Sequence, residues 1–181
     1  MSSIIKKILL SFFLISLSIS SFAQNCTSKF EGYDVDLDLT VNKVYAEKLY
    51  WKSGSFIRSY VGTDENNEPF FAIYLSRTID VRSKDIFQIN EGQKLVLVTD
   101  KSPTRLFAKQ NMEARMATIG KVRFIVQVYS ITKDQIKELS ENPIKTINLE
   151  ISGAENIVGK VSSQTANKVA SNFMCALQDL Q

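Results

Sequence analysis

The chain has no histidine among its 181 residues. Histidine supplies the general base of Ser/His and Cys/His catalytic pairs, and it is a frequent ligand of protein-bound metals. Its absence excludes those catalytic pairs and every metal site that depends on an imidazole. The chemistries that remain open are carboxylate pairs, Ser/Lys dyads, tyrosine and metals bound by oxygen ligands.

The chain also lacks an apolar run long enough to cross a membrane. The run at residues 8–19 covers 12 positions, whereas a membrane-spanning helix needs about 20. Lys6 and Lys7 precede this run, and the small residues Ser21 and Ala23 follow it. A basic start, a short apolar run and small residues at the last and third-last positions are typical of a signal peptide.

We therefore predict that residues 1–23 are a signal peptide cleaved before Gln24. The product would be exported to the periplasm or secreted, with no transmembrane span after cleavage. A lipid anchor on Cys26 is the alternative. Asn25 occupies the position where a lipoprotein signal requires a small residue, so we favour ordinary cleavage.

Once the signal peptide is removed, the chain has little net charge. The whole sequence has 22 basic and 19 acidic residues, and the signal peptide contains two of the lysines and no acid. Its loss lowers the formal net charge from +3 to +1. Since no Lys/Arg-rich run remains, we expect no nucleic-acid partner. Glycine and proline are scarce and no repeat is visible, so we predict a single domain over residues 24–181.

Most of this domain shows the alternation of apolar and polar residues that is typical of half-buried strands. Residues 34–41 alternate without a break, and a turn is predicted at residues 42–43. Residues 86–99 predict a hairpin around Asn90-Glu91-Gly92. Residues 109–120 are weakly patterned, which leaves a mobile loop and one or two helical turns as alternatives. Further strands are predicted at residues 44–52, 56–61, 70–75, 104–108, 122–129, 144–151 and 157–161.

A short helix is predicted after the strand at residues 122–129. Thr132 and Gln135 have the spacing of a capping box, and Ile131 can pack on Ile136 as a hydrophobic staple. Pro143 ends this helix because proline disfavours the helical conformation in the residue before it.

A longer helix is predicted over about residues 163–180, where apolar residues recur at helical spacing. Its apolar stripe consists of Ala166, Val169, Ala170, Phe173, Leu177 and Leu180. The sequence thus predicts an α+β fold, with a predominantly antiparallel sheet packed by the long C-terminal helix and one short helix.

The chain has only two cysteines, Cys26 and Cys175. At 100° per residue, Cys175 falls opposite the apolar stripe of the last helix, on its polar face. An exported chain favours oxidation, so we predict a Cys26–Cys175 disulfide that fastens the mature N-terminus over this helix. Two free or intermolecular thiols are the alternative.

Two side-chain groups are candidates for binding. Asp34, Asp36 and Asp38 lie on one strand face and could gather a cation, but neighbouring basic side chains can neutralise them, so we predict no metal site. The aromatic residues are concentrated in the first half of the domain. They fill the core or line a carbohydrate or lipid pocket, and the pocket hypothesis names Tyr45, Trp51, Phe71 and Tyr74. We predict no cofactor and assign no catalytic residue.

The end of the chain carries a loose set of motifs: Tyr129-Ser130-Ile131-Thr132 after a strand, a short helix, Asn142-Pro143-Ile144, a strand hairpin and a helix with a late cysteine. With these motifs, residues 86–178 resemble small exported proteins of Bacteroidota of unknown function. The resemblance implies no active site. We expect a non-enzymatic binding or accessory module for an envelope protein or a small ligand. The alternative is a small hydrolase or a lipid- or carbohydrate-binding enzyme that uses carboxylates and tyrosines.

Overall fold

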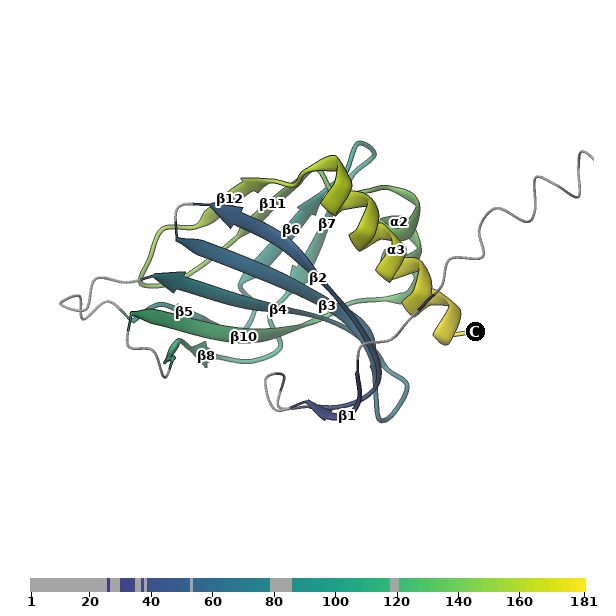
Figure 1. The fold of residues 1–181 in the computed structure, drawn as a ribbon, viewed down its shortest axis with the longest axis horizontal. Helices are drawn as coiled ribbons and strands as arrows, with labels where there is room; N and C mark the ends of the chain where they lie inside the picture. Colours follow the sequence, from purple (N-terminus) through teal and green to yellow (C-terminus); the bar gives the residue numbers. More distant parts are fainter. Residues whose placement is uncertain are drawn as a thin grey trace, which may run out of the picture.

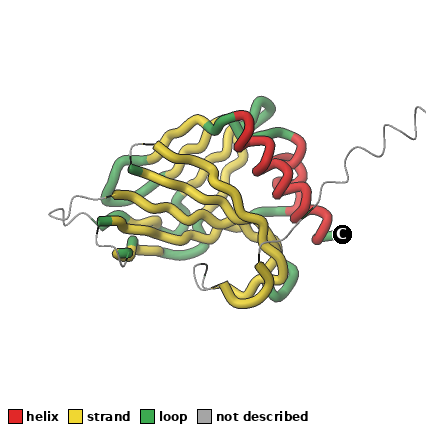
Figure 2. The backbone as a smooth tube through the Cα atoms, viewed as in Figure 1, coloured by secondary structure: helices red, strands yellow, loops and turns green. Residues whose placement is uncertain are grey.

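The computed structural model describes Cys26, Leu37 and residues 30–34, 39–52, 54–78, 86–117 and 121–181. Strands dominate these residues, as Figure 2 shows, and two helices accompany them. The strands are β1 (Phe30–Asp34), β2 (Leu39–Lys52), β3 (Ser55–Asp64), β4 (Pro69–Thr78), β5 (Gln88–Ile89), β6 (Lys94–Val98), β7 (Pro103–Phe107), β8 (Met112–Glu113), β9 (Arg115–Met116), β10 (Val122–Ser130), β11 (Thr146–Leu149) and β12 (Ile157–Lys160). The helices are α2 (Lys133–Glu141) and α3 (Ser163–Asp179). The predicted α+β class is therefore confirmed, with a long helix at the C-terminal end.

The strands form two main antiparallel sheets. The larger sheet has the order β1-β2-β3-β4-β10-β9 and the smaller sheet the order β12-β11-β6-β7, while β5 pairs with β8. In Figure 1 the larger sheet lies in front of the smaller one, and α3 runs along the side of the molecule next to β2. The sequence predicts one sheet, because alternation identifies strands without showing which strands pair.

The main core lies between the two sheets and beneath the helices. Phe71 and Ile73 of β4 enter it from the larger sheet, and Leu95 and Leu97 of β6 enter it from the smaller one. Phe173 of α3 joins them, and its ring stacks on that of Phe71 with the centroids 5.7 Å apart. Burial of each such side chain stabilises the fold by about 1.5–3 kcal/mol. The same core thus holds both sheets and α3 together.

The predicted capping box of α2 is confirmed. The backbone N–H of Gln135 donates to the Thr132 hydroxyl oxygen at 3.2 Å, and the backbone N–H of Thr132 donates to Gln135 Oε1 at 2.9 Å. Ile136 and Leu139 are buried on the inward face of this helix. The helix ends with Asn142 as its C-cap, immediately before Pro143.

Replacing Thr132 with alanine is expected to lower the free energy of unfolding by about 1 kcal/mol, because the backbone N–H of Gln135 loses its acceptor, the Thr132 hydroxyl oxygen. Urea unfolding followed by circular dichroism measures this loss. The matched control is Thr132→Ser, which keeps the hydroxyl group and should stay within a few tenths of a kcal/mol of the parent. Equal stability of Thr132→Ala and the parent would show that the cap is energetically silent.

The alternation at residues 34–41 predicts one continuous strand, but the chain reverses its direction within this segment. β1 ends at Asp34, Leu37 lies in a turn, and β2 begins at Leu39. The turn predicted at residues 42–43 is instead a bulge inside β2, where the pairing with β3 shifts register. Asn42 donates from its side-chain amide to Asn67 Oδ1 of the β3–β4 turn at 2.9 Å. A bulge leaves one residue unpaired without ending the strand, and local sequence does not distinguish it from a turn.

The hairpin predicted for residues 86–99 also pairs differently. β5 takes β8 as its partner, whereas β6 pairs with β7 and β11. The turn at Gly92 is present, with a φ of 78°. After the turn, however, Leu95 of β6 is paired with Leu106 of β7 on one side and with Leu149 of β11 on the other, so both edges of β6 are occupied by other strands. Residues 109–117 contain the two-residue strands β8 and β9 and no helical turn, and residues 118–120 lie outside the described part.

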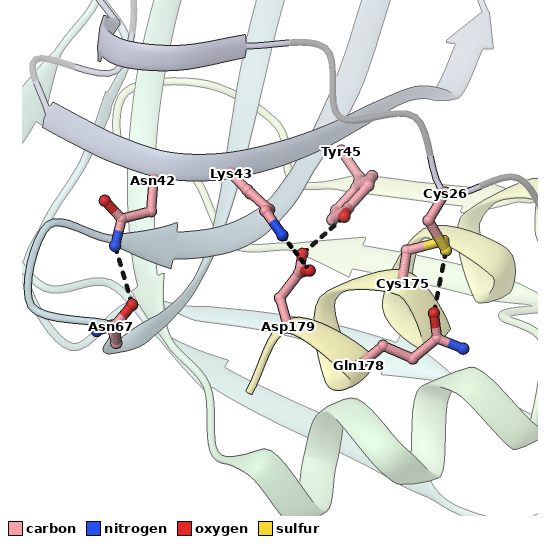
Figure 3. A network of polar contacts seen from close by, with 8 residues as sticks. All are labelled: Cys26, Asn42, Lys43, Tyr45, Asn67, Cys175, Gln178 and Asp179. Carbon is pink, nitrogen blue, oxygen red and sulfur yellow. Dashed lines mark hydrogen bonds and ion pairs between the residues drawn. A yellow bond between two sulfur atoms is a disulfide. The ribbon is translucent and has the colours of Figure 1, made fainter. Parts of the chain in front are cut away.

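The predicted Cys26–Cys175 disulfide is present, with the Cα atoms 5.5 Å apart. Figure 3 shows it beside a polar cluster at the C-terminal end of α3. Asp179 of α3 forms an ion pair with Lys43 at 2.8 Å and accepts a hydrogen bond from the Tyr45 hydroxyl at 2.6 Å, and both partners are in β2.

The prediction that Cys175 lies on a solvent-facing side of the last helix is wrong. Its side chain is 4% exposed and belongs to the main core. Cys175 does lie opposite the apolar stripe on the helical wheel. Near the C-terminal end of α3, however, other parts of the chain cover this side of the helix. β2 contacts that side through Asp179, and the disulfide places Cys26 over it.

Candidate ligand-binding site

The larger sheet is apolar on both of its faces. An antiparallel sheet that packs one face on a core commonly presents polar side chains on the other. On β10, Ile125 and Tyr129 face the main core, whereas Val126 and its neighbours on alternate positions, Phe124 and Val128, lie on the outer face. The outer face therefore carries a second apolar cluster.

Strand register arranges this outer face into rows. Tyr74 of β4 is paired with Arg58 on one side and with Val126 on the other. In the next row, Ser76 lies between Phe56 and Phe124. Directly opposed side chains of an antiparallel pair lie on one face with their Cβ atoms about 5 Å apart. Residues from three strands, distant in sequence, are thus brought onto one surface.

These rows form the floor of a hollow of about 530 Å³, which we call the aromatic hollow. It is lined by Phe56, Arg58, Tyr60, Tyr74, Met116, Ala117 and Phe124. Met116 of β9 and the next residue, Ala117, form one wall of the hollow, because β9 is the edge strand next to β10. A volume of this size lies within the range of about 300–1,000 Å³ that is common for small-molecule pockets.

The aromatic rings of the hollow are held by one another. The rings of Tyr74 and Phe124 stack with centroids 5.5 Å apart, and Phe56 meets Tyr74 edge-on at 6.4 Å. Such pairs are stabilised by about 0.5–1.5 kcal/mol beyond the burial of their area. The hollow therefore has a preformed apolar floor.

Two basic side chains lie beside these rings. Arg58 is exposed, and its guanidinium carbon is 5.8 Å from the centre of the Phe56 ring. Lys48 is paired with Arg58 across β2 and β3, and its Nζ lies 4.4 Å from the ring centre of Trp51 and 5.9 Å from that of Phe56. Like charges directly opposite one another are unfavourable in a sheet. Among the described lining residues there is no carboxylate, so the charge that these residues contribute is positive.

The other end of this outer face is covered. Leu37, in the turn between β1 and β2, is 4% exposed and packs with Val41, Val44 and Phe70. A hollow of about 160 Å³ lies there, lined in part by Leu37 and Phe70. It is smaller than the hollow at the aromatic end.

The smaller sheet has an ordinary outer face. Arg105, Val96 and Asn148 lie in one row across β7, β6 and β11, and Arg105 and Asn148 are exposed. Polar residues therefore alternate with apolar ones on this side, as expected for a sheet that faces water. The apolar outer face is a property of the larger sheet.

The four residues of the predicted pocket do not meet in one place. Tyr74 lines the aromatic hollow, whereas Tyr45 and Phe71 face the main core, 4% and 0% exposed. Trp51 is 69% exposed at the end of β2 and lines a separate cleft. The sequence locates these rings on strands of the first half but does not show the face on which each ring lies.

Sequence reasoning counted Phe56 and Tyr60 among the first-half aromatic residues that could line a pocket, but it assigned neither Arg58 nor Phe124 to one. The signal for Arg58 was available, because positions 56, 58 and 60 alternate along one strand and must share a face. Phe124 has no such signal, because it joins the others only through the pairing of β10 with β4.

The other candidate groups are separate from the hollow. Of the three aspartates proposed to gather a cation, Asp36 and Asp38 lie outside the described residues, and Asp34 ends β1. Within the described part of the chain, no three acidic, histidine or cysteine side chains form a group that could hold a metal ion. Burial raises the pKa of the Tyr129 hydroxyl far above its usual value, and the nearby Glu150 charge raises it further. Tyr129 is therefore protonated at neutral pH.

Compared with known protein families, curated proteins and solved structures, the chain matches none of them. Among the described residues, no helix has the length and apolar character required to span a membrane.

Proposed function

We propose that this protein is an exported, non-enzymatic binding module that holds a small amphipathic anion in the aromatic hollow. The observation that carries the proposal is the apolar outer face of the larger sheet, which ends in a hollow with aromatic rings and a basic rim. Exposed apolar surface of this kind commonly marks a binding site in a folded protein.

The chemistry of the hollow favours a particular kind of ligand. Phe56, Tyr74 and Phe124 offer ring faces to an apolar body, and the volume suits a molecule of small-ligand size. The Arg58 guanidinium can donate two parallel hydrogen bonds to a carboxylate or phosphate group. A ligand with an apolar body and one anionic group satisfies both features.

Export is proposed from the signal-peptide pattern of residues 1–23. The disulfide is compatible with an oxidising compartment, because such bonds persist in the periplasm and outside the cell. We place the module there as a carrier or accessory protein, in line with the small exported proteins that it resembles. The long α3, packed beside β2, serves as scaffold in this proposal and leaves the aromatic hollow free.

Titration with the fluorescent aromatic anion anilinonaphthalene sulfonate tests the proposal. The parent protein should bind it, and Arg58→Gln should weaken the binding roughly tenfold, because a hydrogen bond to a charged group is lost. Laurate should displace the probe, whereas lauryl alcohol, which has the same tail and no charge, should displace it roughly tenfold less well.

The matched control is Arg105→Gln, which removes an exposed arginine from the outer face of the smaller sheet. This variant should bind the probe as the parent does. The proposal fails if Arg58→Gln binds unchanged or if the neutral alcohol competes as well as laurate. Displacement by an oligosaccharide of uronic acids alone would assign the site to carbohydrate instead.

A further inference from the structure

A second surface lies where the edges of the two sheets approach each other. A cleft of about 450 Å³ is bounded by the end of β2 and by β12, and its lining residues are Tyr50, Trp51, Lys52, Thr146, Val158, Gly159 and Lys160. β1 pairs with β2 only up to Val44, and β12 is an outer strand of the smaller sheet. Among the described strands, β2 and β12 do not pair with each other. The cleft is therefore flanked by two strand edges.

The hydrogen-bond pattern shows which backbone groups of β12 point into the cleft. The N–H of Glu150 donates to Lys94 O at 3.0 Å, so the even-numbered residues of β11 bond to β6. The odd-numbered residues of β11 then bond to β12, where Gly159 is one partner. Because bonding directions alternate along a strand, the N–H and C=O groups of Val158 and Lys160 face away from β11.

The same reasoning applies to β2. The N–H of Thr78 donates to Gly54 O at 2.9 Å, so the even-numbered residues of β3, including Phe56, bond to β4. Trp51 is paired with Phe56 but does not exchange backbone hydrogen bonds with it. The backbone groups of Trp51 therefore point away from β3, toward the cleft.

The side chains that line this cleft are mainly apolar and basic. Trp51 and Val158 are 69% and 64% exposed, more than any other large exposed hydrophobic residue among those described. A Cβ atom at position 159 would lie 2.1 Å from the Tyr50 ring, so the glycine leaves room for this ring beside β12. Of the residues that the structure describes around the cleft, the charged ones are Lys52 and Lys160, and none is a carboxylate.

We propose that this cleft binds an extended acidic segment of a partner protein, which adds to β12 as a further strand. Strand addition gains its affinity from main-chain hydrogen bonds and its specificity from alternate side chains. The backbone groups of Val158 and Lys160 supply the hydrogen bonds. Trp51 and Val158 receive the apolar side chains, while Lys52 and Lys160 attract the acidic ones.

A synthetic peptide of alternating glutamate and valine, seven residues long and blocked at both ends, tests this proposal. Trp51 is the only tryptophan of the chain, so its fluorescence reports directly on the cleft. The peptide is expected to change this fluorescence in a titration up to about 1 mM. In the complex, the backbone N–H groups of Val158 and Lys160 should exchange with solvent more slowly, as measured by NMR.

The double variant Lys52→Glu/Lys160→Glu should weaken peptide binding roughly tenfold, and added salt should weaken binding to the parent. The matched control is Lys94→Glu/Lys145→Glu, which reverses two exposed lysines outside the cleft and should bind as the parent does. Arg58→Gln should also leave peptide binding unchanged, which separates this cleft from the aromatic hollow.

Three results would overturn the proposal. One is the absence of a fluorescence change with the acidic peptide. Another is equal binding of a peptide with lysine in place of glutamate, and a third is binding without slower exchange at Val158 and Lys160. Edge lysines also protect sheets from self-pairing. Self-association of Lys52→Ser/Lys160→Ser in sedimentation, together with undiminished peptide binding by this variant, would assign them that role instead.

Discussion

The variant Phe173→Ala is expected to lose about 3–5 kcal/mol of unfolding free energy, because it removes a fully buried ring and leaves a cavity. Phe173 is 0% exposed and is the residue through which α3 stacks on Phe71 of the larger sheet. The core cluster that contains Phe173 includes side chains from both sheets and both helices, so the core cannot collapse around the gap by moving one element alone. Urea unfolding followed by circular dichroism measures the loss.

Two further variants separate this effect from a general loss of aromatic surface. Phe107→Ala removes a ring that is 48% exposed on β7, and its unfolding free energy should change by less than about 0.5 kcal/mol. Phe173→Leu keeps most of the buried volume, and its unfolding free energy should fall by only about 1 kcal/mol. This variant can still be measured if Phe173→Ala does not fold. Equal losses for Phe173→Ala and Phe107→Ala would contradict the role assigned to the stacked ring.

Removal of the disulfide is expected to lower the unfolding free energy by about 2–5 kcal/mol. Cys26 and Cys175 are 149 residues apart, so their bond restricts almost the whole unfolded chain. On the chain-entropy account, a loop of this length corresponds to about 5 kcal/mol, and measured values are usually lower. The test compares the parent protein with Cys26→Ala/Cys175→Ala and with the parent under reductant, each by urea unfolding.

The matched control is Asp179→Asn, which keeps the disulfide but weakens the neighbouring contacts to Lys43 and Tyr45. Its loss should be about 1 kcal/mol, the usual contribution of a hydrogen bond with a modest ion-pair term. A disulfide variant as stable as the parent would show that core packing and the contacts at Asp179 hold α3 in place without the covalent bond. Two reactive thiols in the native, unreduced protein would show that the bond does not form.

Local signals in the sequence were sufficient wherever neighbours along the chain decide the structure. The capping box fixed the start of α2 at Thr132, and the apolar stripe located α3 to within a residue of its observed end. The pairing of Cys26 with Cys175 also followed from the sequence, because a chain with two cysteines has one intramolecular choice. The helix signals depend on residues that are close together in the sequence. The disulfide follows because only one intramolecular pairing is available.

The candidate sites depended on contacts that no local signal contains. Phe56 and Phe124 lie 68 positions apart in the chain and meet because β3, β4 and β10 pair in register. Cys175 is buried because β2 and Cys26 cover the face of α3 that the helical wheel predicts to be polar. Likewise, Trp51 and Val158 flank one cleft only because the two sheets leave their edges adjacent.

The sequence by itself thus determined the absence of histidine chemistry, the α+β class, the helix ends and the disulfide partners. Only the tertiary structure decided which face of each strand lies in the core, and therefore which aromatic side chains are available to a ligand. The physical reason is that strand alternation defines two faces but does not rank them. Pairing between distant strands places one face against the smaller sheet and leaves the other, with Arg58 and Tyr74, open in the aromatic hollow.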